Sequence, residues 1–346
     1  TYGKVKGLQQ IGNVLAIVCE EKVLSAYVGA TEYTDTAGNI NVVKSTDPIG
    51  YLRPHAERYG TFLKESIVNT GKYVYFYDIL NGCYVRKAYN GLYPISGDVT
   101  TEQGVYSYKM RSFFKALSES LLDSIYTQDS VLFNQSHYVK VYSGYDPYYN
   151  NIYITVKDSV DTSNCMSLIF HEPTNRWVCK YGAYISGVGG GSATMYPSTR
   201  SKIYHWFSNK LYELYSNSTR CNLYGSQQDS YVQFVTHGAA NVNKIFNAMG
   251  IESDGIWTVD PIEIDASTSY PNGMYSKIPA SNFVVEEGIQ KSEFLKNMKT
   301  RSSSATNYDL WNGEDLRGKV LKIKMTNSDI DKVELFKVDV ISELSK

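Results

Sequence analysis

Short runs of apolar and aromatic residues recur along most of this 346-residue chain, and Gly, Asn, Asp, Pro or Ser separates each run from the next. Runs of about four to eight residues, bounded by turn-forming residues, are typical of antiparallel β-strands. The 31 tyrosines support this interpretation, because tyrosine favours half-buried sheet positions where its hydroxyl stays solvated. Tyrosine is also enriched where proteins meet partners. The sequence therefore predicts an all-β protein, and extensive subunit contacts are compatible with it.

The runs form successive groups of about 40 to 50 residues, each with three or four strands. This spacing is typical of β-propeller blades, and a β-sandwich is the main alternative because its strands follow at similar intervals. Strands are predicted at 10–19, 22–33 and 40–44 around a turn at 35–39; at 67–68, 73–77, 83–86 and 92–95; at 139–144, 152–157, 167–171 and 177–181; and at 193–195, 202–208, 210–216 and 222–224.

One segment, residues 107–125, departs from the β pattern. Its apolar residues recur at helical spacing, which predicts an amphipathic helix that packs across a blade or against a neighbouring subunit. The residues on this face are Met110, Phe113, Phe114, Leu117, Leu121, Leu122 and Ile125.

The pattern changes again near residue 230, where we place a domain boundary. Beyond it, strands are predicted at 232–236, 255–259, 320–325 and 332–340, whereas the charged, serine-rich stretch 282–304 is left unassigned. The predicted domains are residues 1–230, which are propeller blades with a helical insertion at 107–125, and residues 231–346, a smaller C-terminal β-rich unit. The blades are expected to form part of a propeller that another segment or chain completes.

Charge and cysteine content exclude several classes of protein. The chain has 34 basic and 35 acidic residues, so no net charge attracts a phosphate backbone, and specific nucleic-acid recognition is not expected. Its five cysteines contain no Cys-x-x-Cys pair, which indicates neither a zinc site nor a disulfide framework and fits assembly in a cytoplasm. The longest apolar run, residues 14–19, is too short to span a membrane, and no signal peptide is visible.

No motif in the sequence predicts catalysis, a cofactor or a metal. Four of the five histidines recur at about the spacing of one blade, but none has a second ligand at helical or hairpin spacing. The glycine-rich stretch 186–192 lacks the residues of a phosphate-binding loop and is interpreted as a connection between blades. Adjacent acidic residues, such as Glu20 and Glu21, point to opposite faces of a strand. The four histidines are His137, His171, His205 and His237.

An ordered series of motifs resembles a known family. In sequence, the motifs lie at 48–50, 65–67, 73–78, 81–82, 90–96, 144–155, 168–177 and 315–324. The series resembles the propeller-bearing tail proteins of podoviruses, and above all the muzzle proteins of crAss-like phages. The resemblance covers about residues 45–340, and its specificity lies in the order and spacing of the motifs.

The resemblance and the sequence pattern together assign architectural roles to eight residues. In the family, a hairpin of the form Asp-Pro-x-x-Asn followed by an Asn and Trp hairpin builds a blade, and a late Arg-Gly segment belongs to a terminal β unit. Trp177 and Trp206 are interpreted as anchors of blade cores. The residues that carry these roles here are Asp146, Pro147, Asn150, Asn175, Trp177, Trp206, Arg317 and Gly318.

The resemblance also implies a function and partners. It implies a structural virion protein in a ring at the distal end of the tail, which frames and closes the ejection channel and helps deliver the genome and cargo proteins. The ring, expected to be hexameric, is assembled in the cytoplasm of the host bacterium. Its expected partners are identical subunits, the amino-terminal part of the same precursor, and other tail proteins such as nozzle, ring and cargo proteins. The family proteins are longer than this chain, so the resemblance implies a carboxy-terminal portion, released by proteolysis and still bound to its amino-terminal part. The first residue, Thr1, fits either such a cleavage product or a chain shortened in another way.

Two other functions remain as alternatives. A propeller that binds carbohydrate or a receptor would use exposed aromatic rings to stack on sugars, and Trp177, Trp206, Trp257 and Trp311 are the candidates. A polysaccharide-cleaving enzyme would need a pair of carboxylates from different blades, about 5–10 Å apart. The structural function is preferred because the matching residues are architectural.

Overall fold

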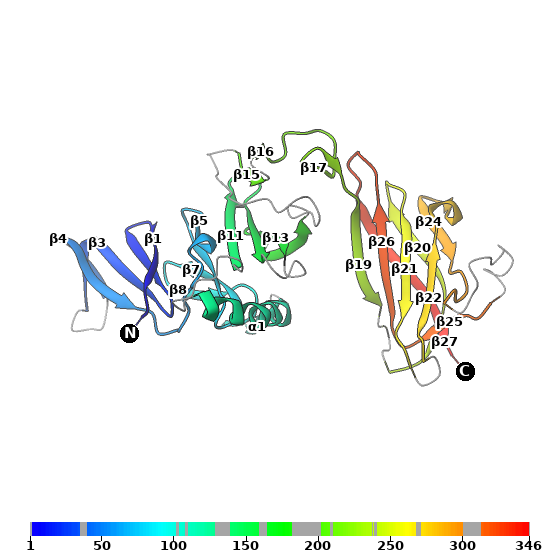
Figure 1. The fold of residues 1–346 in the computed structure, drawn as a ribbon, viewed down its shortest axis with the longest axis horizontal. Helices are drawn as coiled ribbons and strands as arrows, with labels where there is room; N and C mark the ends of the chain where they lie inside the picture. The colour runs from blue at the N-terminus through cyan, green and yellow to red at the C-terminus, as the bar shows by residue number, and fades with distance from the viewer. Residues whose placement is uncertain are drawn as a thin grey trace. The chain divides into compact units, whose positions relative to one another are not determined.

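The computed structural model describes residues 2–34, 40–101, 104–107, 110–128, 139–158, 165–181, 202–207, 210–236, 238, 241–267, 271–299 and 313–345. The chain divides into two compact units, Thr1–Ser216 and Asn217–Lys346 (Figure 1). The sequence placed a boundary at 230, whereas this division lies earlier. A backbone contact accounts for the difference, because the N–H of Arg220 donates to the Ile330 carbonyl, 2.7 Å away, within the second unit.

The first unit contains three four-stranded antiparallel sheets, and each is a meander in chain order. The first sheet consists of β1 (Val5–Ile11), β2 (Val14–Cys19), β3 (Val23–Thr34) and β4 (Ile40–Pro54). The second consists of β5 (Val68–Asn69), β6 (Val74–Asp78), β7 (Cys83–Ala88) and β8 (Gly91–Pro94). The third consists of β11 (Val139–Asp146), β12 (Asn151–Asp158), β13 (Met166–His171) and β14 (Arg176–Tyr181).

Shorter elements complete the first unit. They are the 3₁₀ turn η1 (Lys64–Ser66), the hairpin of β9 (Asp98–Thr101) and β10 (Gly104–Ser107), helix α1 (Arg111–Gln128), and the hairpin of β15 (Tyr204–Phe207) and β16 (Lys210–Glu213). The predicted turn at 35–39, the stretch 186–192 and the predicted strand at 193–195 lie outside the described residues.

Two sequence predictions for this unit were wrong in detail. Residues 10–19 are not one strand, because Gly12 has φ +57° and turns the chain so that Ile11 pairs with Val14. The helix begins at Arg111 and not at 107, because Ser107 still pairs with Asp98 in the β9–β10 hairpin.

The three sheets stack face to face in chain order. Alternate strand residues point to opposite faces, so each sheet has two faces to cover. The first sheet packs Val18 and Val23 against Phe76, Val85 and Leu92 of the second sheet. The other face of the second sheet packs against the third sheet, and the far face of the third sheet packs against the β15–β16 hairpin. The described residues of the stack do not form a closed propeller.

Helix α1 lies against the second and third sheets, where it contacts β7 and β11. Phe114, Leu117 and Leu121 are buried in the same hydrophobic cluster as the facing sides of these sheets. The predicted apolar stripe of the helix thus packs within its own chain, across two sheets.

The second unit is a sandwich of two antiparallel sheets. One has the strand order β19 (Ser230–Thr236), β26 (Leu321–Asn327), β21 (Thr258–Ile264) and β22 (Met274–Ile278). The other has the order β23 (Val284–Glu286), β24 (Ile289–Glu293), β20 (Lys244–Ser253) and β25 (Leu316–Gly318), and β27 (Leu335–Leu344) also pairs with β20. The unit further contains β17 (Asn222–Leu223), β18 (Ser226–Gln227) and the 3₁₀ turn η3 (Ala280–Asn282).

The two sheets of the second unit share one hydrophobic cluster. Met249 and Ile251 of β20 meet Val259 of β21 and Ile323 and Met325 of β26, and all five side chains are buried. Burial along β26 alternates strictly between buried and half-buried residues, as expected for a strand with one face in the core. The predicted all-β fold class is therefore confirmed.

Candidate functional site

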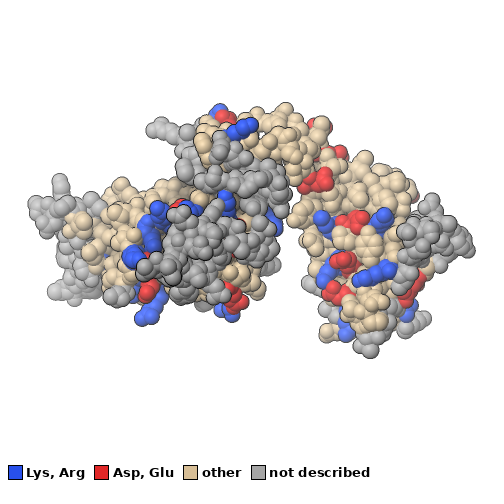
Figure 2. All heavy atoms as spheres, in the orientation of Figure 1, with Lys and Arg blue, Asp and Glu red and all other residues tan. Residues whose placement is uncertain are grey.

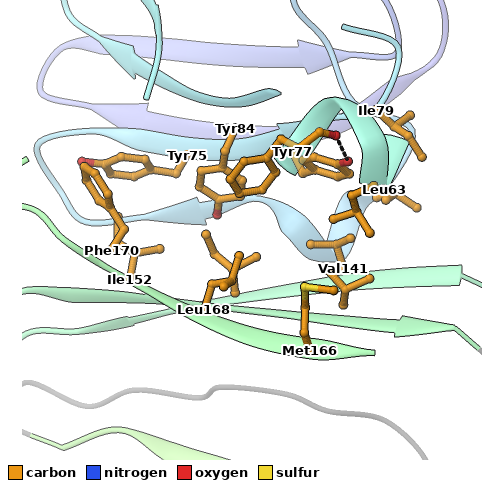
Figure 3. Close-up of a cluster of buried hydrophobic side chains, with 14 of the residues drawn as sticks. Leu63, Tyr75, Tyr77, Ile79, Tyr84, Val141, Ile152, Met166, Leu168 and Phe170 are labelled. Carbon is orange, nitrogen blue, oxygen red and sulfur yellow. Dashed lines mark hydrogen bonds between the residues drawn. The ribbon is translucent and has the colours of Figure 1, made fainter. Parts of the chain in front are cut away.

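The contact between the second and third sheets is here called the sheet junction. It contains the largest cluster of buried hydrophobic side chains in the described part of the first unit (Figure 3). Tyr75, Tyr77 and Tyr84 project from the second sheet toward the third, and all three are buried. Burial raises the pKa of each phenol, so the hydroxyls remain protonated. The apolar residues that they face include Val141, Ile152, Met166, Leu168 and Phe170.

Two of these hydroxyls link the elements of the junction. The hydroxyl of Tyr84 lies 2.7 Å from the Oγ of Ser143 in β11, so it joins the second sheet to the third. The hydroxyl of Tyr77 lies 2.7 Å from the Oγ of Ser118, so it joins the second sheet to helix α1. Buried hydroxyls are costly without a partner, and these pairs therefore favour one alignment of the three elements.

Trp177 joins the same three elements. Its indole Nε1–H donates to the Ile95 carbonyl of the second-sheet region at 2.8 Å. Its ring centroid lies 5.0 Å from that of Phe114 in helix α1 and 5.2 Å from that of Phe170 in its own sheet. The structure thus places Trp177 at the junction of two sheets and the helix, and its role as the anchor of a propeller blade stays a prediction.

Asn175 lies at the polar end of the junction. Its φ of 51° makes the tight turn before Trp177, and its Oδ1 accepts a hydrogen bond of 2.6 Å from Nη1 of Arg86 in the second sheet. The Arg86 guanidinium also lies 4.9 Å from the ring centroid of Tyr73. Nearby, burial raises the pKa of the Glu172 carboxyl, although Lys72 and Arg86 oppose the shift.

The Asp146–Asn150 turn connects β11 to β12. The Oδ1 of Asp146 accepts the backbone N–H of Tyr148 at 2.9 Å, Pro147 fits the turn with its fixed φ, and Asn150 adopts a φ of 54°. The hydroxyl of Tyr145 donates to Oδ1 of Asn150 at 2.8 Å. These contacts fix a hairpin.

Trp206 differs from the expectation that it anchors a blade core. It lies on β15 and is 40% exposed. Its neighbour His205 is fully buried and faces the third sheet with Ile203. Because strand residues alternate, Trp206 points away from this contact, where it pairs across the hairpin with the exposed Leu211.

Arg317 and Gly318 lie in β25 of the second unit, where they pair with Ile245 and Lys244. The N–H of Arg317 donates to the sulfur of Met274 at 3.3 Å. A Cβ on Gly318 would lie 2.5 Å from Cγ2 of Ile264 in the opposite sheet. Glycine therefore permits the close approach of the two sheets at this position.

A buried polar group between the first and second sheets was not predicted from the sequence. Ser25 Oγ and His55 Nε2 lie 2.9 Å apart, and Lys87 donates to the carbonyls of Ala88 and Tyr89. Burial lowers the pKa of Lys87 to about 8, and burial with the charge of Lys87 lowers the pKa of His55 to about 4. A histidine of such low basicity is a poor general base for a serine, so the pair is interpreted as structural.

Within the described parts of the chain, no group of three or more His, Cys, Asp or Glu side chains could hold a metal ion. His171 bonds Thr174 at 2.7 Å and His205 is a buried residue of β15, whereas His137 and His237 lie outside the described residues. No helix in the described chain is long and apolar enough to cross a membrane. The described cysteines are free, and they are Cys19, Cys83, Cys165, Cys179 and Cys221.

These features define a class of protein: an all-β chain whose predicted site residues form turns, sheet contacts and core anchors, with the exposed Trp206 as the exception. Residues 218–312, roughly a quarter of the chain, match the family model described as the Crassvirus muzzle protein C-terminal domain. The resemblance to the muzzle protein of crAss-like phages is thereby confirmed, and the matched domain indicates a structural protein of a phage tail. No curated protein matches the chain.

Proposed function

We propose that this chain is a structural component of the distal end of a phage tail and forms part of a β-propeller that frames and closes the ejection channel. In this role it contributes to delivery of the genome and of cargo proteins. The observation that carries the proposal is the stack of three four-stranded antiparallel sheets in chain order, in a chain whose second unit matches a muzzle domain.

The order and packing of the three sheets support the proposed propeller. In a propeller, consecutive four-stranded meanders pack face to face around an axis. Here the second sheet is covered on both faces by the sheets that precede and follow it in the chain. The remaining blades come from the amino-terminal part of the same precursor or from neighbouring subunits, which form a ring that we propose to be hexameric. Nozzle, ring and cargo proteins are the further proposed partners.

The charge distribution suits the wall of a channel. The formal net charge is −1, and the face of the second unit drawn in Figure 2 carries basic and acidic side chains close together. Among the ion pairs of the second unit are Lys322 with Asp265 at 2.6 Å and Lys337 with Asp339 at 2.7 Å. A strongly basic surface would retain passing DNA through its phosphates, whereas a mixed surface lets it pass.

Electron microscopy of intact particles tests this function. We expect the chain in a ring at the tip of the tail, with its first three sheets inside a closed propeller and the channel along the axis. A position in the capsid or in a side fibre would contradict the proposal. So would a stack whose ends face solvent in the assembled particle.

Binding of carbohydrate is a second candidate function, and exposed aromatic rings favour it. Tyr148, Tyr149 and Tyr215 form a surface cluster with ring centroids 4.7 and 5.0 Å apart, and Trp206 is exposed on a hairpin. A glycan array probed with the purified chain tests this candidate. Binding that Trp206→Ala or Tyr149→Ala abolishes, and that Tyr89→Ala leaves intact, would support it.

A further inference from the structure

Strand β27 (Leu335–Leu344) forms one edge of its sheet in the second unit. The residues from Ala248 to Glu252 of β20 pair with both β24 and β27, so these two strands lie on opposite sides of β20. Among the described strands, β27 pairs with β20 alone. Every second N–H and C=O group of β27 therefore points away from the sheet, and such an edge is a template for pairing with another strand.

Another strand can reach this edge along its whole length. Val338 and Val340 pack against the core of the second unit and are only half-buried, whereas most of their neighbours along β27 are exposed. Phe336 is 61% and Leu344 66% exposed. The strand also contains neither proline nor glycine, the residues that weaken strand pairing.

The regular part of β27 is the stretch 337–344. A bulge between Leu335 and Lys337 precedes it. Beyond the bulge, side chains alternate between the two faces of the sheet. Antiparallel pairing places directly opposite residues on the same face, so a second β27 can pair only in registers that keep this alternation. The residues on the outward face are Lys337, Asp339, Ile341 and Glu343.

Two such registers pair the longest regular stretch of β27 with itself. In the first, residues 337–343 pair about a two-fold axis at Val340, and Lys337 stands opposite Glu343 of the second copy at both ends. In the second, residues 338–344 pair about Ile341, and Asp339 stands opposite Glu343. Opposite charges stabilise a directly opposite pair and like charges destabilise it. The charges of β27 therefore select the register about Val340.

We propose that, in the chain free in solution, β27 pairs antiparallel with β27 of a second copy about a two-fold axis at Val340. The contact joins two five-stranded sheets into one and covers an edge that would otherwise recruit other strands. It uses the same surface on both copies, so it joins copies in pairs and does not extend around a ring. The inference is therefore independent of the proposed propeller.

The charges of β27 also disfavour an uncharged strand as the partner. Charged side chains on an edge strand usually hinder pairing, because a neutral neighbour leaves them unmatched. Strand β19, the exposed edge strand of the opposite sheet, presents Tyr231, Gln233 and Val235 outward and thus no charge to match Lys337. A copy of β27 supplies the matching carboxylate of Glu343 at each end.

Charge reversal in the full chain tests the proposal. In Lys337→Glu, carboxylates would face each other at both ends of the paired strands, and in Glu343→Lys, ammonium groups would do so. Each variant alone should dimerise about tenfold more weakly than the native chain, or weaker still. An equimolar mixture of the two variants should recover dimerisation to within about threefold, because every glutamate then faces a lysine. Sedimentation velocity measures the dissociation constants.

The matched control is Lys291→Glu. Lys291 is likewise an exposed lysine of this sheet with a carboxylate partner, Glu286, but it lies on β24, away from the edge formed by β27. This variant should dimerise like the native chain. The side chains of Lys337 and Glu343 are exposed, so both reversal variants should keep the native melting temperature.

Three results would each overturn the proposal. They are a native chain that stays monomeric, reversal variants that dimerise like the native chain, and a mixture that dimerises no better than its components. Because the measurement uses the purified chain, its failure is distinguishable from that of the proposed function, which depends on the position of the chain in the particle.

Discussion

The two units of this chain bury their sheets in different ways. In the second unit, two sheets cover each other around one core. In the first unit, three sheets follow one another in a stack, and the middle sheet is covered on both faces. In a two-layer sandwich, the inner face of each sheet is covered by the other sheet. In a stack, the first and the last layer each keep one face that the stack itself does not cover.

The difference shows where each unit depends on its surroundings. At one end of the stack Val5, Leu8 and Leu52 are exposed, and at the other end Trp206 and Leu211 are exposed. In the second unit, the inward faces of both sheets meet each other, and charged residues pair on its surface, as Lys291 does with Glu286 at 3.1 Å. The main core of the second unit is thus closed between its own two sheets, whereas the stack of the first unit ends in exposed apolar residues on both sides.

The largest expected loss of stability comes from removing a large buried side chain at the sheet junction. Phe170→Ala removes a fully buried ring that touches Tyr75 and Trp177, and it should lower the free energy of unfolding of the first unit by about 3–5 kcal/mol. Hydrogen exchange read by mass spectrometry should show faster exchange in β6, β7, β12 and β13. Exchange in the second unit should not change, since it is a separate compact unit.

The matched change in the sandwich is Ile323→Ala, which removes a fully buried side chain from β26. It should cost about 2–5 kcal/mol in the second unit alone. If either substitution accelerated exchange equally in both units, the comparison between two independent cores would fail.

A smaller effect is expected at Trp177. Trp177→Phe keeps an aromatic ring but removes the indole N–H that bonds the Ile95 carbonyl, and it should destabilise the first unit by about 1–3 kcal/mol. The control is Trp206→Phe, which changes an exposed ring and should stay within about 0.5 kcal/mol of the native chain. Denaturant unfolding measures both, and equal costs would mean that Trp177 does not hold the junction.

An overpacking change probes the contact between the sheets of the second unit. Gly318→Ala adds a methyl that would lie 2.5 Å from Cγ2 of Ile264, and it should cost about 1–3 kcal/mol. The matched control is Gly238→Ala, because a Cβ there meets nothing within 4 Å. Calorimetry of the two variants compares their melting temperatures. If Gly318→Ala had the same melting temperature as Gly238→Ala, the two sheets would not approach closely at residue 318.

The smallest expected effect is a loss of stability of the first unit as the pH falls to about 6, and it again distinguishes the two units. Burial lowers the pKa of His205 from 6.5 to about 4. As the pH falls from 6.5 to 4, the unfolded chain therefore takes up a proton that the folded chain excludes, and the first unit loses stability. Near pH 6 the loss should be less than about 1 kcal/mol. In the second unit the shifted pKa values are those of Tyr275, Lys322 and Lys337, and all three are raised, away from this range.

A variant isolates the histidine from other groups. Burial raises the pKa of Asp78 and Glu172 in the same unit, and these carboxyls change stability with pH in the opposite direction. We therefore expect the unfolding free energy of His205→Gln to fall less steeply than that of the native chain between pH 6.5 and 4. Parallel curves would show that His205 is not excluded from protonation.

The third sheet could be predicted almost strand by strand. Its strands were expected at 139–144, 152–157, 167–171 and 177–181, and each lies within two residues of these bounds. The reason is local, because apolar runs alternate here with Asn150 and Asn175, which adopt the positive φ that tight turns require. Turn residues of this kind can be recognised in the sequence alone.

Non-local features escaped prediction. Strand β20, central to the second unit, was not expected, because a bulge between Phe246 and Ala248 interrupts the alternation of its apolar residues. Strands β23 and β24 lie in the unassigned stretch, because each is short and charged residues interrupt the apolar run between and within them, such as Glu286, Glu287 and Lys291. The hydrogen bond from Trp177 to the Ile95 carbonyl joins segments that are far apart in the chain. A local sequence pattern cannot predict such a pair.

Stacking in chain order also has a consequence for synthesis. Each sheet of the first unit pairs strands that are neighbours in sequence, so a meander can form as soon as it leaves the ribosome and then serve as the template for the next. The sandwich must wait, because Ser230 of β19 meets Asn327 of β26, 97 residues later. A nascent chain would thus fold from its amino-terminal end, with the first sheet formed before the last strand has been translated.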